Sequence, residues 1–252
     1  MEARPLAVIT GGSSGIGLAL ARRLATRHWR LALVARGTER LEAAAMALPV
    51  ETSIHPCDVG DPDAVTALAA QLLELGQGRI DMLVCNAGIP GRSGALDVDP
   101  AVARQVMDTN YHGMVGLTRA LWPGLVKARG RVVNVCSVAG TVALARSAPY
   151  AASKHAALAW SRALGAAAPA QGVRVLTVSP GPVATAGFPQ TKLLAHPIAR
   201  RFVVTDEQCA AAIIRGLENR RREIFVPQYW RLAGIAQAIA PETIARLAAR
   251  AG

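Results

Sequence analysis

Aromatic residues are scarce in this chain of 252 residues: they make up 4% of it, whereas hydrophobic residues make up 52%. With so few aromatic residues, the hydrophobic core must be built from Ala, Val and Leu side chains. This composition suits helices packed on a sheet in one large domain. No apolar run approaches the ~18 residues that a membrane-spanning helix needs. The N-terminus lacks the basic and apolar regions of a signal peptide, because residues 6–10 already have a strand pattern. We therefore expect a cytoplasmic protein with no transmembrane span.

Cysteine and histidine are also few, with four and five copies. Neither type occurs at the spacing of metal ligands, so we predict no metal site. Three of the cysteines lie in or beside apolar, strand-like runs. We interpret all four as reduced thiols of a cytosolic protein.

Acidic residues are outnumbered, with 17 Asp and Glu against 28 Lys and Arg, for a net charge of +11. One explanation is a general preference for arginine in the source proteome. The other is an anionic ligand such as a phosphorylated cofactor. The basic residues form no patch interleaved with aromatics, which argues against nucleic acid as a partner.

Strand and helix patterns alternate along the chain, and this favours a doubly wound parallel sheet of about seven strands with helices on both faces. The predicted strands are residues 6–10, 31–35, 50–57, 81–86, 131–136, 173–178 and 223–226. The predicted helices are residues 15–26, 39–47, 62–75, 100–127 and 149–168, the fourth kinked or broken near Pro123.

No linker divides the chain, so we interpret residues 1–252 as a single domain with two appendages. Residues 180–205 hold four prolines and show no periodicity, which is typical of a lid or binding loop. The tail, residues 229–252, carries apolar residues at helical spacing, and Pro241 divides it into two predicted helices. The tail could cover a substrate pocket, pack against a partner subunit or rest on a membrane surface; we favour the first two.

A glycine-rich turn joins the first predicted strand to the first helix. Glycines at 11, 15 and 17 allow a tight turn and close approach of a pyrophosphate, and the helix N-terminus supplies oriented N–H groups. The residues of this candidate cofactor site are Gly11, Ser13, Ser14, Gly15, Ile16 and Gly17. A purely structural turn is the alternative.

Further candidates for the cofactor site follow the later strands, because ligands bind at the carboxyl ends of parallel strands. Asp58 can accept a hydrogen bond from an exocyclic amine of adenine. Small residues after the fourth and sixth strands permit close approach of backbone and cofactor. The candidates at these ends are Asp58, Val59, Asn86, Ala87, Gly88, Pro180, Gly181, Val183 and Thr185.

Tyr150 and Lys154 are four residues apart on a predicted helix, so they share one face. A nearby cation favours the ionised form of a phenol, which a tyrosine needs to act in proton transfer at neutral pH. Ser137 follows the fifth strand, where its hydroxyl can bond a substrate oxygen. Asn110 is a poor helix former inside a long helix, and it could bend that helix or hold a water.

Taken together, these motifs resemble the short-chain dehydrogenases/reductases, in the single-domain branch with a Rossmann fold. The resemblance covers about residues 5–226. It implies that Tyr150 is the general acid/base, that Lys154 supports it and binds the nicotinamide ribose, and that Ser137 orients the carbonyl. It also implies that Asn110 holds a relay water, that Thr185 holds the carboxamide, and that the helices of Asn110 and Tyr150 form a two-fold interface. We therefore expect a homodimer or homotetramer.

Two positions depart from the family pattern. Cys85 stands where a second Asn often precedes Asn-Ala-Gly, and the chain continues for about 25 residues after its last strand. The expected activity is hydride transfer between a nicotinamide cofactor and an apolar carbonyl compound or secondary alcohol. Reduction of a 3-oxoacyl thioester is the alternative within the class, because Lys192, Arg200 and Arg201 could meet an acidic carrier. A nucleotide-binding sensor without catalysis is the alternative outside it.

The end of the second strand decides which dinucleotide binds. NAD enzymes place a carboxylate there to accept from the ribose 2′-hydroxyl, but this chain has Ala35. Arg36 follows directly and can pair with a 2′-phosphate, and Arg40 may add charge. The sequence thus predicts a preference for NADP(H) over NAD(H).

Overall fold

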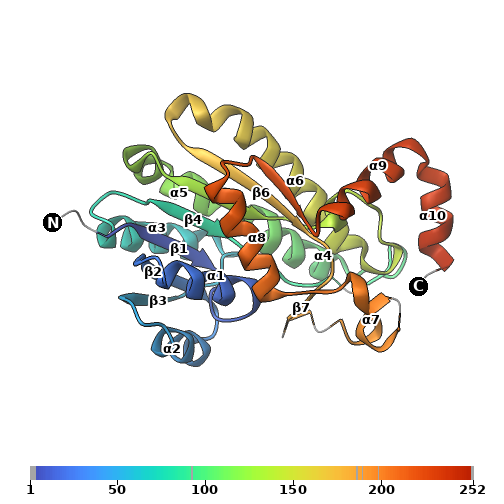
Figure 1. Ribbon diagram of the computed structural model, residues 1–252, viewed down its shortest axis with the longest axis horizontal. Helices are drawn as coiled ribbons and strands as arrows, with labels where there is room; N and C mark the ends of the chain where they lie inside the picture. The colour runs from blue at the N-terminus through green and yellow to red at the C-terminus, as the bar shows by residue number, and fades with distance from the viewer. Residues whose placement is uncertain (1–3, 92, 186, 189, 198, 251–252) are drawn as a thin grey trace.

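The computed structural model describes residues 4–250 apart from positions 92, 186, 189 and 198 (Figure 1). A seven-stranded sheet with every pairing parallel forms the centre, in the order β3-β2-β1-β4-β5-β6-β9. Its strands are β1 (Leu6–Thr10), β2 (Arg30–Ala35), β3 (Thr52–Pro56), β4 (Met82–Cys85), β5 (Arg131–Val135), β6 (Arg174–Pro180) and β9 (Glu223–Val226). This confirms the doubly wound Rossmann fold, with strand ends shifted by one or two residues.

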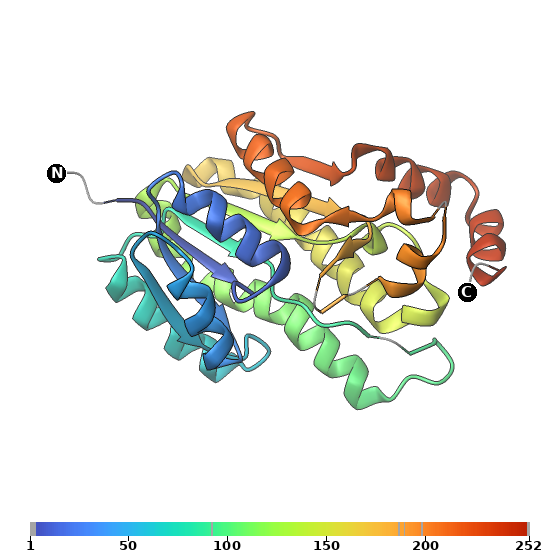
Figure 2. The ribbon, with the colours of Figure 1, turned by 60° about the horizontal axis from the view of Figure 1, so that its bottom comes forward.

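Helices cover both faces of the sheet and give the molecule two apolar cores (Figure 2). One core lies under α3 (Pro62–Leu75), α5 (Gly113–Ala128) and α6 (Ala148–Ala167). The other lies under α1 (Gly15–Ala25), α2 (Thr38–Met46) and α8 (Asp206–Glu218). Because both faces are covered, the central strands are nearly continuous runs of buried aliphatic residues.

Local signals in the sequence fix where several helices begin. Asp61 caps α3, since its carboxylate accepts from the N–H groups of Asp63 and Ala64, and Pro62 occupies the first turn. Thr205 and Gln208 form a reciprocal capping box at the start of α8. These caps fix the residues at which α3 and α8 begin, and both helices then pack against the sheet.

The predicted helix over 100–127 is interrupted, but not at Pro123. It consists of α4 (Pro100–Met107), a π-helical turn over Asp108–His112, and α5. Pro123 lies inside α5, which continues through it because Leu121 and Leu125 on either side are fully buried. The interruption centres on Asn110, whose side chain is held from outside the helix.

The two appendages contain more regular structure than a loop. Between 180 and 205 lie β7 (Val183–Ala184), α7 (Thr191–Ala195), a 3₁₀ turn at Ala199–Phe202 and β8 (Val204–Thr205), with β7 and β8 paired in parallel. The tail forms α9 (Arg231–Ile239) and α10 (Pro241–Arg250), divided at Pro241 as predicted. Its last two residues lie outside the described part. No helix in the described residues has the length and apolarity to cross a membrane.

Candidate functional site

A cavity of about 930 Å³ opens at the carboxyl edge of the sheet. The strand order reverses between β1 and β4, where an open α/β sheet leaves a crevice for ligands. The volume lies within the range of cofactor and substrate pockets. Among the residues predicted from sequence, those that line it are Gly11, Ser14, Gly15, Ile16, Asn86, Ala87, Gly88, Ser137, Tyr150, Lys154, Pro180, Gly181, Val183 and Thr185.

The glycine turn forms one wall of the cavity, and its glycines have no room for side chains. Gly11 and Gly15 adopt φ of 65° and 53°, a region that favours glycine. A Cβ on Gly11 would lie 2.7 Å from Asn86 Nδ2, and one on Gly17 would collide with the Gly11 carbonyl. The turn delivers the chain into the N-terminus of α1, whose first turn carries no acid. This cradle therefore fits a pyrophosphate.

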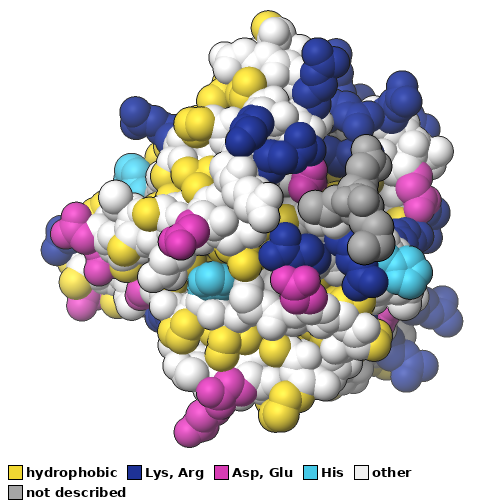
Figure 3. Space-filling view, turned by 90° about the vertical axis from the view of Figure 1, so that its left-hand side faces the viewer, with side chains coloured by type: hydrophobic (Ala, Val, Ile, Leu, Met, Phe, Trp, Pro, Cys, Tyr) yellow, Lys and Arg dark blue, Asp and Glu magenta, His cyan; other side chains and the backbone are white. Residues whose placement is uncertain are grey.

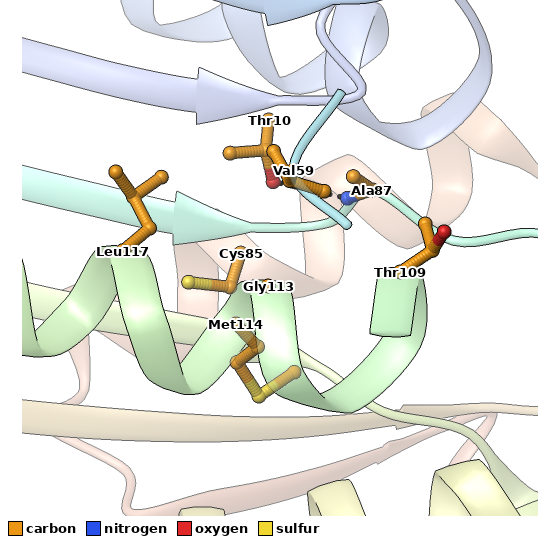
Figure 4. A pocket seen from close by; sticks show the side chains of 8 residues that line it. All are labelled: Thr10, Val59, Cys85, Ala87, Thr109, Gly113, Met114 and Leu117. Atoms are coloured by element: carbon orange, nitrogen blue, oxygen red, sulfur yellow. Dashed lines mark hydrogen bonds between the residues drawn. The ribbon is translucent and has the colours of Figure 1, made fainter. Parts of the chain in front are cut away.

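Thr10 holds the end of β4 against this turn. Its Oγ1 accepts from the N–H groups of Asn86 and Ala87, at 2.9 and 3.0 Å, and donates to the Val84 carbonyl at 3.2 Å. The Asn86 amide donates to the carbonyls of Thr10 and Gly11. Figure 4 shows the Thr10–Ala87 contact beside a second cavity of only about 10 Å³, which is too small for a substrate.

Lys154 lies at the base of the main cavity and is 4% exposed. Its Nζ donates to the Val135 carbonyl at 3.0 Å and lies 5.8 Å from the centroid of the Tyr150 ring. No carboxylate forms an ion pair with it in the described part of the chain. The side chain is thus an amine held by backbone on one side and facing the phenol on the other. This confirms that the spacing of four residues brings the two groups together.

The Tyr150 ring lines the cavity together with Ser137 and Phe188. Ser137 follows β5, and its Oγ accepts from the Ala139 N–H at 3.1 Å, which leaves the hydroxyl proton available to another acceptor. The centroid of the Phe188 ring lies 5.6 Å from the centroid of the Tyr150 ring. The phenol therefore faces a pocket with a hydroxyl on one side and an apolar ring on the other.

Asn110 lies just behind the cavity and is fully buried. Its Oδ1 accepts from the Ile89 N–H at 2.8 Å, while its Nδ2 donates to the Ile89 carbonyl and to Ser153 Oγ, both at 3.0 Å. Ser153 Oγ donates in turn to the Tyr150 carbonyl at 2.8 Å. The side chain therefore ties the loop after β4 to the helix that carries Tyr150 and Lys154.

Besides Asn110, six predicted residues lie outside the lining of the cavity. Arg36 and Arg40 are exposed beyond β2, whose end is bonded to the glycine turn through Gly12 N–H and the Val34 carbonyl. Asp58 is exposed, and its carboxylate accepts from Gly60 N–H. The remaining three are Ser13, Gly17 and Val59.

Sequence reasoning missed Ser153 as a bridge and Gly140 as a contact of the Tyr150 helix. A Cβ on Gly140 would collide with the Lys154 carbonyl. Trp230, from the tail, also lines the cavity and packs on Gly181. Neither of the glycine contacts has a local signal, because both join residues far apart in the sequence.

A buried thiol, that of Cys136, is also among the residues that line the cavity. Burial raises the pKa of Cys136, which precedes Ser137, to about 12. Burial has the same effect on the pKa of Cys85, also to about 12. At neutral pH both are protonated, so they act as small apolar side chains of the core. Among the described residues, no group of His, Cys, Asp or Glu side chains is arranged to hold a metal ion.

Comparison with known proteins agrees with this geometry. The family described as short chain dehydrogenase matches residues 5–192. Dehydrogenase/reductase SDR family member 7B of Bos taurus is 39% identical over 71% of this chain, a match that spans 58% of that relative. The Xenopus laevis protein of the same description is 34% identical over 87% of this chain and 72% of its own length.

Two solved structures of similar fold are complexes with nicotinamide cofactors. An alcohol dehydrogenase from the archaeon Thermococcus sibiricus, complexed with 5-hydroxy-NADP, has a TM-score of 0.79 and 28% identity, covering 88% of this chain and 96% of that one. An actinorhodin polyketide ketoreductase with NADPH has a TM-score of 0.77 and 30% identity, covering 84% and 89%. The fold of these two proteins is similar to that of this chain, and the ligands bound to them support a nicotinamide cofactor as the ligand of the cavity.

Proposed function

This chain belongs to the short-chain dehydrogenases/reductases and is an oxidoreductase, and we propose that it transfers a hydride between NADP(H) and an apolar carbonyl compound or secondary alcohol. The observation that carries the proposal is the phenol of Tyr150 beside the buried amine of Lys154 in the main cavity. A nucleotide-binding protein without catalysis has no use for this pair. The nicotinamide cofactor supplies the hydride when bound, and the glycine cradle fits its pyrophosphate.

Tyr150 is the proposed proton donor to the substrate oxygen in reduction and the acceptor in oxidation. Lys154 is proposed to place its positive charge next to the phenol, since its Nζ lies 5.8 Å from the centroid of the Tyr150 ring. The amine is buried, so bulk water screens its charge only weakly. Its hydrogen bond to the Val135 carbonyl fixes its position. Lys154 also holds the nicotinamide ribose in this proposal.

Ser137 orients the reacting oxygen, since its hydroxyl proton is free to donate. Asn110 acts behind the site. It fixes α6, the helix that carries Tyr150 and Lys154, and it retains a water for proton relay to Lys154. Thr185, at the start of the lid, holds the carboxamide. Residues 180–205 form the proposed lid, in which the centroid of the Phe188 ring lies 5.6 Å from that of the Tyr150 ring.

The substrate class follows from the rest of the lining, which is mostly apolar. Its aliphatic and aromatic members are Val138, Ala139, Val142, Leu144, Phe188, Leu193 and Trp230. A hydrophobic ketone, aldehyde or secondary alcohol fits such walls. Arg146 also lines the cavity and could meet a carboxylate or phosphate at the far end of a substrate. Reduction of a 3-oxoacyl thioester is the second candidate, favoured by this arginine and by the likeness to a polyketide ketoreductase.

The proton-donor role is tested with Tyr150→Phe, measured by NADPH oxidation over a panel of carbonyl compounds. We expect kcat to fall at least a hundredfold, the usual contribution of general acid–base catalysis, with NADPH affinity nearly unchanged. Phe188→Leu is the matched control, because it alters the same wall without removing a proton. If Tyr150→Phe retained more than about a hundredth of the wild-type kcat, Tyr150 would be excluded as the acid.

The preference for NADP(H) rests on Arg36 and on the missing carboxylate at Ala35. Arg36 is exposed at the end of β2 and has no ion-pair partner among the described residues, so it is available to a 2′-phosphate. Arg36→Ala should raise KM for NADPH at least tenfold, because a charge-assisted contact of ~1.5–3 kcal/mol is lost. KM for NADH should change little, and Arg221→Ala, on a distant turn, should change neither. Equal wild-type kcat/KM for both cofactors would contradict the preference.

Assembly and location complete the proposal. We place the enzyme in a reducing compartment, the cytoplasm, because the four cysteines are free thiols. We also propose a homodimer or homotetramer that joins through the helices of Asn110 and Tyr150. Measurement of the mass in solution by light scattering checks it, and a monomer at micromolar concentration would refute it.

A further inference from the structure

The helix α9 is apolar in composition, yet none of its nine residues is buried. Leu232, Ile235 and Ile239 are 64%, 45% and 78% exposed. Their spacing of three and four residues puts them on one face of the helix. Figures 1 and 2 show α9 and α10 projecting from the body of the molecule at its C-terminal end. This face therefore has no partner within the described part of the chain.

The apolar surface continues from α9 to the rim of the cavity. The Phe202 ring meets the rings of Tyr229 and Trp230, at 5.9 and 6.2 Å between centroids. Phe202 and Tyr229 are each 43% exposed, and Trp230 lines the cavity. Leu194, from the lid, is 45% exposed. Such a contiguous patch around a pocket mouth marks an interaction surface.

Positive charge accompanies this patch, and negative charge is absent from its sequence. Residues 190–205 and 227–241 contain one lysine and three arginines and no Asp or Glu. The arginines, Arg200, Arg201 and Arg231, are exposed and have no ion-pair partner among the described residues. Arg200 and Arg201 directly precede Phe202, and Arg231 begins α9. The surface therefore combines large aliphatic side chains with uncompensated charge of one sign.

These properties discriminate between the possible occupants. A two-fold contact with a second copy would bring the same arginines together with no acid from these segments to neutralise them. An anionic lipid surface neutralises all three and receives the aliphatic face at the boundary between headgroups and acyl chains. We propose that α9, with the ring cluster and these arginines, docks on an anionic membrane surface. In this orientation the mouth of the cavity faces the lipid.

Charge elsewhere on the molecule supplies a matched control. Figure 3 shows Lys and Arg gathered on the face at the left of Figure 1, where the strands begin. Arg220, Arg221 and Arg222 are exposed on the turn before β9. Neutralising them removes the same net charge as neutralising the three arginines of the patch. Attraction that depends on net charge alone would respond equally to either change.

The test is co-sedimentation of the full chain with two kinds of vesicle. One consists of phosphatidylcholine alone, and the other contains about 30% phosphatidylglycerol as the anionic lipid. We expect binding to the anionic vesicles only, weakened by raised salt. Arg200→Gln/Arg201→Gln/Arg231→Gln should weaken it by about fivefold for each charge removed, since each basic residue near the surface contributes about that factor. The triple Gln variant of Arg220–Arg222 should have a much smaller effect.

The apolar contribution is tested separately. Leu232→Ser/Ile235→Ser should weaken vesicle binding at least tenfold, because it removes aliphatic area from the inserted face. Met46→Ser, at a side chain 82% exposed on α2, is the control and should have no effect. Neither change touches a buried residue, so the melting temperature should be unaltered.

Three results would overturn the proposal: no binding to anionic vesicles, equal loss of binding with both arginine triplets, or a dimer in solution that the Leu232→Ser/Ile235→Ser variant dissolves. The last result would assign the surface to a second copy. Binding to a purified acidic carrier protein without binding to vesicles would likewise assign it to a protein. The vesicle assay needs no turnover, so its failure is distinguishable from failure of the proposed chemistry.

Discussion

Replacing Asn110 by Ala should destabilise the protein more than any single hydrogen bond could explain. Asn110 is fully buried and makes three side-chain hydrogen bonds of 2.8–3.0 Å, two to Ile89 and one to Ser153. Each such bond contributes about 1 kcal/mol net, so three bonds account for about 3 kcal/mol, and partners left incompletely paired raise the cost further. We expect a loss of about 3–5 kcal/mol in the free energy of unfolding, a large share of the ~5–15 kcal/mol of a typical domain.

Urea unfolding followed by circular dichroism and by tryptophan fluorescence measures this loss. Ser153→Ala is the matched variant, because it removes the hydroxyl from the same network and keeps Asn110 in place. It should lose about 1–2 kcal/mol, and the double variant should lose about 1 kcal/mol less than the sum, since the two residues share one bond. A loss below about 1 kcal/mol for Asn110→Ala, or strict additivity, would refute the clamp between the β4 loop and α6.

Further predictions concern a glycine and the thiols. A Cβ at Gly181 would collide with the Trp230 indole, so Gly181→Ala should displace that ring, shift its fluorescence and raise KM for the substrate; an unchanged emission spectrum would contradict this contact. In the native protein, a thiol reagent at pH 8 should modify Cys57 first, because it alone is not fully buried, and denaturant should expose four thiols. Burial raises the pKa of Cys209 to about 12, so the unfolded chain releases this proton first, near 9.0, and stability falls between pH 9.0 and 12. Cys209→Ala should make that fall shallower by about 1.4 kcal/mol per pH unit, measured by urea unfolding.

The elements that could be predicted are those with signals in adjacent residues. The helix of Tyr150 and Lys154 follows from its alanine content, and the pairing of the two side chains follows from helical geometry alone. The glycine turn after β1 is equally local. The sheet order needed more than local patterns, but alternation of strand and helix leaves few ways to build a parallel sheet.

The parts that could not be predicted depend on contacts between distant segments. Asn110 was identified as an unusual residue in a helix, but its partners are 21 and 43 residues away, so the π-helical turn had no local signal. The predicted break at Pro123 does not occur, since α5 continues through this residue, whose neighbours Leu121 and Leu125 are buried. The pairing of β7 with β8 is likewise invisible in strands of two residues.

The tail shows why composition alone could not assign its role. The spacing of its apolar residues is helical, and this predicts two helices but not what their faces contact. In the structure two different environments occur in one short stretch of the tail: Trp230 lines the cavity and packs on Gly181, while Leu232, Ile235 and Ile239 in the following helix are exposed. Because the half-buried Trp230 and the exposed face are adjacent in the chain, a membrane that docks on α9 as proposed also lies close to one wall of the cavity. We therefore expect docking and substrate entry to be coupled, so a variant that releases the tail should change both affinity for the surface and KM for apolar substrates.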